Sequence, residues 1–343
     1  MTVYSGTFDV RDEQLMRRAM SAALQARLVA RPNPWVGAVV VARDGSTFEG
    51  CTAAPGGPHA EISALRRAGE AARGATLYST LEPCSHTGRT GPCTRAIIDA
   101  GVERVVVGVL DPDAKVAGKG VEQLRDAGVT VDVGVCAEPV RTQLAAYLHH
   151  RTTGRPWVVL KMASTLDGRT AAADGSSRWI TGEIARQRVH ELRAESDAVL
   201  VGAGTVRADD PALTVRDAQG PSPRRIVLGS APADAKVHPC TEWSGDLESL
   251  LDSLGSEGVL QLLVEGGARV AADFHRRGLV DRYVFHLAPA IAGGDDAPSV
   301  FSGAAAANIA DMWRGRIVSL QQLGDDVEVV VEPTKFAERQ DKK

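Results

Sequence analysis

The chain has 343 residues, more than one typical domain needs and enough for two. Hydrophobic residues make up 44% and charged residues 24%, and the formal net charge of -4 argues against a nucleic-acid binder that relies on bulk positive charge. The first residues lack a basic stretch followed by an apolar one. No apolar run approaches the roughly 20 residues that span a bilayer. We therefore expect a cytoplasmic protein without membrane contact.

The first half of the chain alternates predicted helices and strands. An alanine-rich helix is predicted from Asp12 to about Ala30, and Pro32 and Pro34 prevent its continuation. Strands are then predicted over 35–42, 75–82, 104–111 and 129–135, and helices over 59–73, 93–101, 120–128 and 141–150. This alternation with short connections predicts a three-layer α/β domain with a mostly parallel sheet, which we assign to residues 1–150.

A second α/β domain is predicted at residues 156–335. The polar segment 151–156 carries glycine and proline and is the predicted linker. Strands are predicted over 157–163, 198–204, 224–230, 260–267, 282–290 and 327–332, and helices over 182–195 and 268–278. Residues 231–258 have no clear pattern.

Four residues of the first half form a pattern typical of a catalytic zinc site. His59 and Glu61 open a predicted helix, Cys84 follows a strand, and Cys93 begins the next helix. One imidazole and two thiolates give zinc three protein ligands and leave a fourth position for water, whose pKa zinc lowers towards neutrality. Glu61 would carry protons from this water to the leaving amine. The order H-x-E, P-C, C matches zinc deaminases, although eight residues separate the cysteines in place of two.

Other interpretations of this pattern remain open. A nucleoside or nucleic-acid deaminase with a C-terminal binding module would favour a basic surface and a C-x-x-C loop. A purely structural zinc would need a fourth protein ligand, for which His86 is the nearby candidate. In a third interpretation the sequence His59-Ala60-Glu61 occurs by chance and has no function, and the two cysteines are ordinary buried thiols.

Two glycine-containing stretches of the second half follow apolar strands. Residues 202–205 (GAGT) and 265–267 (EGG) would let backbone N–H groups approach a phosphate, and the helix that begins near Ala268 would offer its positive end to a pyrophosphate. Neither stretch is a full G-x-G-x-x-G. The residues alone therefore leave both dinucleotide binding and ordinary turns open.

Longer motifs resemble the bifunctional deaminase/reductase family of riboflavin biosynthesis. The first half carries RPNPWVGAVV, HAE, TLEPCSHTGRTGPC and VAGKG; the second carries LKMASTLDGRT, SSRWI, LVGAGTVRADDPALTVR and LVEGGARV in that order. The resemblance implies an N-terminal cytidine-deaminase-like three-layer α/β/α domain and a C-terminal dihydrofolate-reductase-like α/β domain. It also implies deamination of 2,5-diamino-6-ribosylamino-4(3H)-pyrimidinone 5′-phosphate, followed by NADPH-dependent reduction of the ribosyl to the ribityl side chain.

The resemblance assigns residues to each domain. In the deaminase domain it implies that His59, Cys84 and Cys93 are zinc ligands and that Glu61 is the proton shuttle. It also implies that Asn33 contacts the pyrimidine and that Arg89 or His86 contacts the phosphate. In the reductase domain it implies NADPH contacts at Ala163, Trp179, Thr205, Asp209, Ser230, Gly267, Ala268, Arg269, Val270, Ala271, Ala272 and Asp273. Contacts to the sugar phosphate are implied at Lys161, Ser177, Arg193, Leu213, Arg216 and Glu265. The partners we expect are this phosphorylated pyrimidine and further copies of the chain, as a homodimer or larger homo-oligomer, and no nucleic acid.

Overall fold

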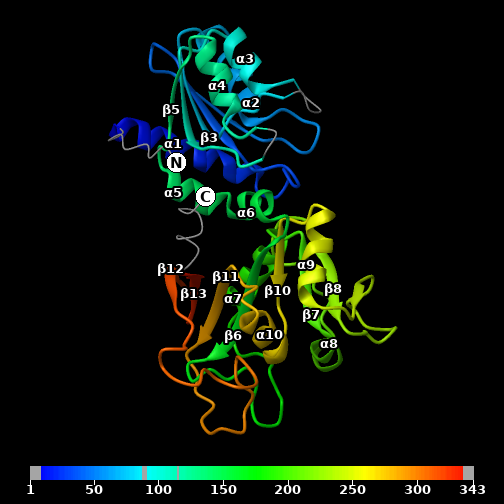
Figure 1. The fold of residues 1–343 in the computed structure, drawn as a ribbon. Helices are drawn as coiled ribbons and strands as arrows, with labels where there is room; N and C mark the ends of the chain where they lie inside the picture. The colour runs from blue at the N-terminus through cyan, green and yellow to red at the C-terminus, as the bar shows by residue number, and fades with distance from the viewer. Residues whose placement is uncertain (1–8, 87–90, 114–115, 335–343) are drawn as a thin grey trace. The chain divides into compact units, whose positions relative to one another are not determined.

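The computed structural model describes residues 9–86, 91–113 and 116–334. The chain divides into two compact units after Gly154, drawn in blue to green and in green to red in Figure 1. None of the helices in the described ranges has the length and apolar character needed to cross a membrane.

The first unit is built on a five-stranded sheet with the order β2-β1-β3-β4-β5. Its strands are β1 (Gly37–Val41), β2 (Thr47–Cys51), β3 (Thr76–Leu81), β4 (Arg104–Val109) and β5 (Thr130–Val133). Strand β1 runs antiparallel to both neighbours, and β3, β4 and β5 are parallel. The helices are α1 (Val10–Ala23), α2 (Ala60–Ala68), α3 (Cys93–Asp99), α4 (Lys119–Asp126), α5 (Ala137–Gln143) and α6 (Ala145–Thr153), with short 3-10 turns at Leu24–Ala26 and Gly69–Ala72.

Two glycines show that helices cover both faces of this sheet. A Cβ at Gly37 would lie 1.9 Å from the carbonyl oxygen of Ala19 in α1, and one at Gly50 would lie 2.3 Å from that of Ala60 in α2. Gly50 pairs with Ala38, the neighbour of Gly37, so the two glycines face opposite sides. Helices α1 and α2 therefore pack directly on opposite faces, as a three-layer α/β/α unit requires.

The second unit is built on an eight-stranded sheet with the order β12-β13-β11-β6-β10-β7-β8-β9. Its strands are β6 (Trp157–Thr165), β7 (Ala198–Gly202), β8 (Arg224–Leu228), β9 (Thr241–Trp243), β10 (Gln261–Val264), β11 (Arg282–Ala288), β12 (Gly315–Leu323) and β13 (Asp326–Pro333). Strand β13 is antiparallel to β11 and β12, and the other pairs are parallel. The helices are α7 (Glu183–Ala194), α8 (Ala203–Asp209), α9 (Leu247–Ser256) and α10 (Ala268–Arg276).

Helices of the second unit also lie on both faces of its sheet. Leu250 of α9 and Phe274 of α10 share one hydrophobic core with Leu160 of β6, and Val331 of β13 packs against it. Helix α7 approaches the other face, where its Arg188 contacts Glu328 of β13 at 3.4 Å. The side chains of Glu328 and Val331 point to opposite faces because three positions separate them along the strand.

The predicted fold class is confirmed, while several elements were absent from the prediction. Strand β2 was missed because its residues are mostly half-buried, and β12 because all but its last residue are exposed, so neither shows the apolar pattern of a core strand. The helix predicted over 141–150 is two helices, α5 and α6, which meet at Leu144. The strand predicted over 198–204 ends at Gly202, and the stretch 202–205, for which phosphate binding and an ordinary turn were both open, opens the short helix α8. The unreadable segment 231–258 contains β9 and α9.

Candidate active sites

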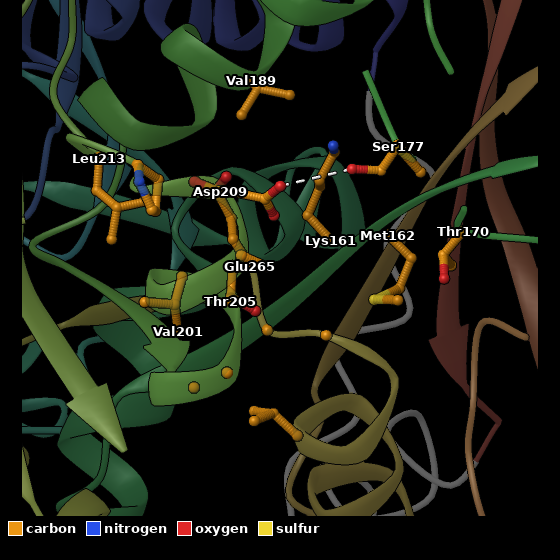
Figure 2. A pocket seen from close by; sticks show the side chains of 18 of the residues that line it. Lys161, Met162, Thr170, Ser177, Val189, Val201, Thr205, Asp209, Leu213 and Glu265 are labelled. Atoms are coloured by element: carbon orange, nitrogen blue, oxygen red, sulfur yellow. Dashed lines mark hydrogen bonds between the residues drawn. The ribbon is translucent and has the colours of Figure 1, made fainter. Parts of the chain in front are cut away.

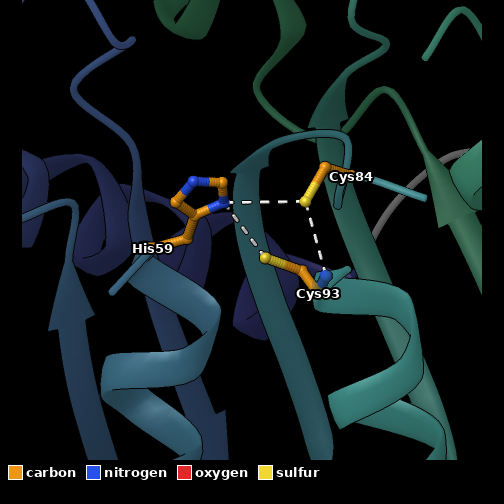
Figure 3. A group of neighbouring side chains, drawn as sticks. All are labelled: His59, Cys84 and Cys93. Carbon is orange, nitrogen blue, oxygen red and sulfur yellow. Dashed lines mark hydrogen bonds between the residues drawn. The ribbon is translucent and has the colours of Figure 1, made fainter. Parts of the chain in front are cut away.

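Three potential metal ligands converge in the first unit (Figure 3). His59 precedes α2 in an extended conformation, Cys84 follows β3, and Cys93 is the first residue of α3. The Nδ1 atom of His59 lies 3.2 Å from Sγ of Cys93 and 3.6 Å from Sγ of Cys84. All three donor atoms lie within 4.8 Å of one another.

This spacing suits a tetrahedral zinc ion. Zn–N bonds of about 2.1 Å and Zn–S bonds of about 2.3 Å separate a nitrogen from a sulfur ligand by about 3.6 Å. One nitrogen–sulfur distance, 3.6 Å, equals that separation, and the other, 3.2 Å, is slightly shorter. Small side-chain adjustments would therefore accommodate the ion. The residues present therefore fit zinc and leave its fourth position for water or substrate.

The surroundings of the cluster shift its protonation. Glu61 is 4% exposed in the first turn of α2, and burial, together with the negative Cys84 sulfur, raises the pKa of its carboxyl to about 7. Hydrogen bonding from Cys93 and His59 lowers the pKa of Cys84 to about 4, although burial opposes this. The same contact and burial raise the pKa of Cys93. Within the cluster the pKa of the Cys84 thiol is therefore lowered and that of the Cys93 thiol is raised.

The other deaminase residues are less closely tied to the cluster. Val36 and Thr52 exchange hydrogen bonds, which brings the segment after Asn33 beside the loop that leads to His59. His86 is exposed. Arg89 lies outside the described residues.

A cavity of about 1230 Å³ opens in the second unit (Figure 2). Its wall includes Lys161 of β6, Gly202 at the end of β7, and Glu265 and Gly267 just after β10. These parallel strands bring their carboxyl ends to one edge of the sheet, the usual place for a ligand site in such a fold. Gly267 has an extended backbone and precedes α10 directly, so the free N–H groups of that helix face the cavity edge.

Three charged side chains dominate one part of the cavity. Arg193 of α7 donates two hydrogen bonds to the Glu265 carboxylate, at 2.7 and 2.8 Å, and this pairing holds the pKa of Glu265 below its ordinary value although burial opposes it. Burial lowers the pKa of the neighbouring Lys161, against the attraction of Glu265. Among the described residues the Lys161 amine has no hydrogen bond or ion pair. It is therefore available to a ligand.

Most of the predicted reductase residues line this cavity. They are Lys161, Ala163, Ser177, Trp179, Arg193, Thr205, Asp209, Leu213, Arg216, Glu265, Gly267, Ala268, Arg269 and Val270. Ser177 donates to Asp209 at 3.5 Å, which joins a residue predicted for the substrate to one predicted for NADPH (Figure 2).

Four predicted NADPH contacts are not among the described residues that line the cavity. Ala271 and Ala272 are fully or nearly fully buried, and Ala271 belongs to the core beneath α10. Asp273 pairs with Arg276 at 2.7 Å. Ser230 is exposed beyond the end of β8. The burial of Ala271 and Ala272 follows from helical geometry, because they lie with Phe274 on the buried face of α10.

The sequence interpretation missed several polar residues of the cavity wall. His190, Arg207 and Lys236 all line it. His190 precedes Arg193 by three positions on α7, so helical spacing could have identified it. Arg207 and Lys236 had no comparable signal. Lys236 lies in the segment without a readable pattern, and it forms an ion pair with Asp210, which also lines the cavity, at 3.0 Å.

Comparisons with known proteins agree with this arrangement. Residues 9–109 match the cytidine and deoxycytidylate deaminase zinc-binding region, and residues 156–329 match the RibD C-terminal domain. The riboflavin biosynthesis protein RibD of Aquifex aeolicus is 43% identical over 313 residues, which cover 82% of this chain and 88% of the relative. The chain belongs to the RibD family.

Solved RibD structures extend the similarity to both units. The structure of Acinetobacter baumannii RibD is 37% identical, with a TM-score of 0.88 over 94% of this chain and 99% of that chain. A structure from Thermotoga maritima is 36% identical, with a TM-score of 0.84 over 94% and 98%. A RibD protein is a riboflavin biosynthesis enzyme with deaminase and reductase activities, which supports this interpretation over a nucleoside or nucleic-acid deaminase with a binding module.

Removing one thiol tests the zinc ligands. In Cys84→Ala the cluster loses one of its two sulfur donors, so we expect zinc affinity to fall by more than about 100-fold, beyond the effect of a typical neighbouring residue. Elemental analysis of the purified protein should find about one zinc per chain in the unchanged protein and little in the variant. Cys51→Ala, which removes a thiol of the same unit outside the cluster, should keep its zinc. Full zinc retention in Cys84→Ala would contradict this ligand set.

Proposed function

We propose that the first unit deaminates 2,5-diamino-6-ribosylamino-4(3H)-pyrimidinone 5′-phosphate and that the second reduces the ribosyl group of the product to ribityl. We assign the deaminase domain to residues 1–150 and the reductase domain to residues 156–335. The observation that carries the proposal is one chain holding both a His-Cys-Cys cluster with a buried carboxyl and a charged, glycine-edged cavity. The Thermotoga maritima relative is described as a diaminohydroxyphosphoribosylaminopyrimidine deaminase and 5-amino-6-(5-phosphoribosylamino)uracil reductase, which supports these two substrates.

In the deaminase reaction His59, Cys84 and Cys93 hold zinc. When bound, zinc supplies a Lewis acid that makes water nucleophilic near neutral pH. The Glu61 carboxyl lies in the first turn of α2, two residues after His59, and is shielded from bulk water. It would accept one proton of the attacking water and deliver it to the ring nitrogen, and then carry the second proton, from the hydroxyl formed on the carbon, to the amine, which departs as ammonia. Asn33 holds the pyrimidine from the neighbouring segment.

In the reductase reaction the cavity aligns cofactor and sugar. NADPH supplies the hydride, and the N-terminus of α10 with the glycine edge around Gly267 suits its pyrophosphate. Thr205 and Asp209 border this part, and Ser177 marks the boundary with the substrate. The side chains that contact the sugar phosphate line the rest of the cavity wall. They are Lys161, Arg193, Leu213, Arg216 and Glu265. Holding both partners in one cavity brings C1′ within reach of the nicotinamide.

A second copy of the chain is also part of the proposal. Strand β12 is an edge of the large sheet, and its Ile317 and Leu320 are 64% and 69% exposed. Ile309 and Met312, just before it, are exposed as well. An apolar edge strand of this kind is open to aggregation unless another strand or chain covers it, which favours a homodimer through β12. We place the protein in the cytoplasm, because none of its five cysteines forms a disulfide.

Mass spectrometry of the products tests the two reactions. The protein should convert the diaminopyrimidinone phosphate to the deaminated ribosyl compound without NADPH, and to the ribityl compound with it. Glu61→Gln removes the proton carrier, so deamination should slow by about 10²–10⁴-fold while zinc content stays the same. Reduction of supplied deaminated substrate should continue at the rate of the unchanged protein. Undiminished deamination by the variant would rule out this role for Glu61.

Arg216 provides a test of the phosphate contact. A charge-assisted hydrogen bond contributes about 1.5–3 kcal/mol, so Arg216→Ala should raise the KM for the deaminated substrate roughly 10- to 150-fold. NADPH at about 100 times its Kd should still stabilise the variant by about 2.7 kcal/mol in thermal unfolding, as it does the unchanged protein. Arg277→Ala removes an exposed arginine at the end of α10 and should leave both values as they are. An unchanged KM in Arg216→Ala would remove this residue from the site.

A charge on the exposed strand tests the dimer. Leu320→Lys places an ammonium in the proposed apolar interface, so the protein should sediment as a monomer at concentrations where the unchanged chain is a dimer. Leu24→Lys makes the same change at an exposed position of the first unit and should leave the dimer intact. Sedimentation equilibrium distinguishes these states, and a monomer before any substitution would refute the interface.

A further inference from the structure

A buried carboxylate lies beside the zinc cluster without belonging to it. Glu82 follows β3, two residues before Cys84, and is 3% exposed. Its two oxygens accept hydrogen bonds from four backbone N–H groups, at 3.1 Å from Asp111, 3.0 Å from Gly118, 2.9 Å from Gly120 and 3.2 Å from Val121. All of the donors lie between the end of β4 and the first turn of α4. Glu82 thus joins the segment before Cys84 to the start of another helix.

Helix α4 also contacts the residue that follows the other cysteine. Thr94, which follows Cys93, donates from its hydroxyl to the Gln123 side chain of α4 at 2.7 Å. The backbone N–H of Thr94 donates to the carbonyl of Cys84 at 3.2 Å. A Cβ at Gly120 would lie 2.0 Å from the carbonyl oxygen of Pro83, so α4 begins directly against the chain that leads to Cys84. Both cysteines are therefore braced on the same helix.

A simple cap of α4 does not account for this arrangement. A capping side chain satisfies N–H groups of the first helical turn. Glu82 also accepts from Asp111, which lies beyond the end of β4 and outside α4. The carboxylate that accepts these bonds belongs to the residue directly after β3, so the bonds fix the end of β3 relative to both β4 and α4.

We propose that Glu82 is a positioning residue that holds Cys84, and through α4 also Cys93, at the spacing that zinc requires. This inference rests on the zinc site of the proposed function. The Glu82 carboxylate bonds backbone N–H groups and none of the ligand atoms of His59, Cys84 and Cys93, and it acts through the backbone that leads to Cys84. Neighbouring residues that orient metal ligands commonly set the affinity of the metal.

Glu82→Gln is the sharpest variant. The glutamine amide keeps one acceptor oxygen and turns an NH2 group towards two of the N–H donors, so half of the four bonds are lost while size and shape are retained. We expect the zinc dissociation constant to rise about 10- to 100-fold. Thr94→Val, which removes the hydroxyl bond to Gln123 at constant shape, should weaken zinc binding to a smaller extent.

The experiment is a zinc titration of the full-length protein in competition with a chelating dye. Glu122→Gln makes the same substitution at an exposed position of α4 and should bind zinc as the unchanged protein does. Added zinc should restore deamination by Glu82→Gln with an unchanged KM, and reductase activity should be normal throughout. A purely structural role would not give this rescue by zinc.

Three results overturn the inference. The first is a zinc affinity of Glu82→Gln equal to that of Glu122→Gln. The second is a variant that fails to regain deamination at saturating zinc while Thr94→Val binds zinc normally, which would indicate general unfolding of the first unit. The third is an unchanged protein that binds no zinc, which would refute the zinc site itself and with it the proposed deaminase function.

Discussion

The functional side chains of this protein depend on one constraint of parallel sheets. After most of the parallel strands the chain continues into a helix, and the first N–H groups of that helix have no partner within it. His59 and Cys93 stand at such helix starts in the first unit, and Gly202 and Gly267 do so in the second. Since these positions lie at one edge of each sheet, residues far apart in the sequence meet there. The unsatisfied backbone groups then either bind a ligand or must be occupied by a side chain such as Glu82.

The zinc cluster shows how burial and charge oppose each other. Two thiolates and a carboxylate cannot all be ionised in a space shielded from water unless a cation joins them. The pKa of the Cys84 thiol is accordingly lowered, that of the Cys93 thiol is raised, and the pKa of the Glu61 carboxyl rises to about 7. Metal binding must release the remaining thiol proton, so zinc affinity and pH are linked at this site. Rigid support of the ligands matters here, because ligand side chains that could move apart would reduce their mutual repulsion without binding zinc.

Sequence patterns predicted the features that depend on neighbours along the chain. The H-x-E pair and the two cysteines could be interpreted because their chemistry is local, and alternating apolar runs predicted the fold class. The role of Glu82 could not be predicted, because its partners lie 29 to 39 positions away and offer only backbone N–H groups, which any residue has. Strand β12 was not predicted for a different reason. Its apolar side chains are exposed, so they indicate a strand only once a surface that covers them is known. The cavity omits Ala271 and Ala272 because helix periodicity turns them to the core, a detail that a family resemblance does not supply.

Charge balance explains why the reductase cavity suits an anionic sugar. Glu265 neutralises Arg193 through two short hydrogen bonds, and the pair is rigid because both side chains are nearly buried. Lys161 and Arg216 also line the wall, and neither forms an ion pair with a described acidic residue. The cavity therefore has an excess of positive charge although the whole chain carries a formal net charge of -4. A phosphate dianion compensates this excess without displacing the Arg193–Glu265 pair, whereas a neutral sugar would leave Lys161 desolvated and unpaired. This charge balance supports the proposed phosphorylated substrate.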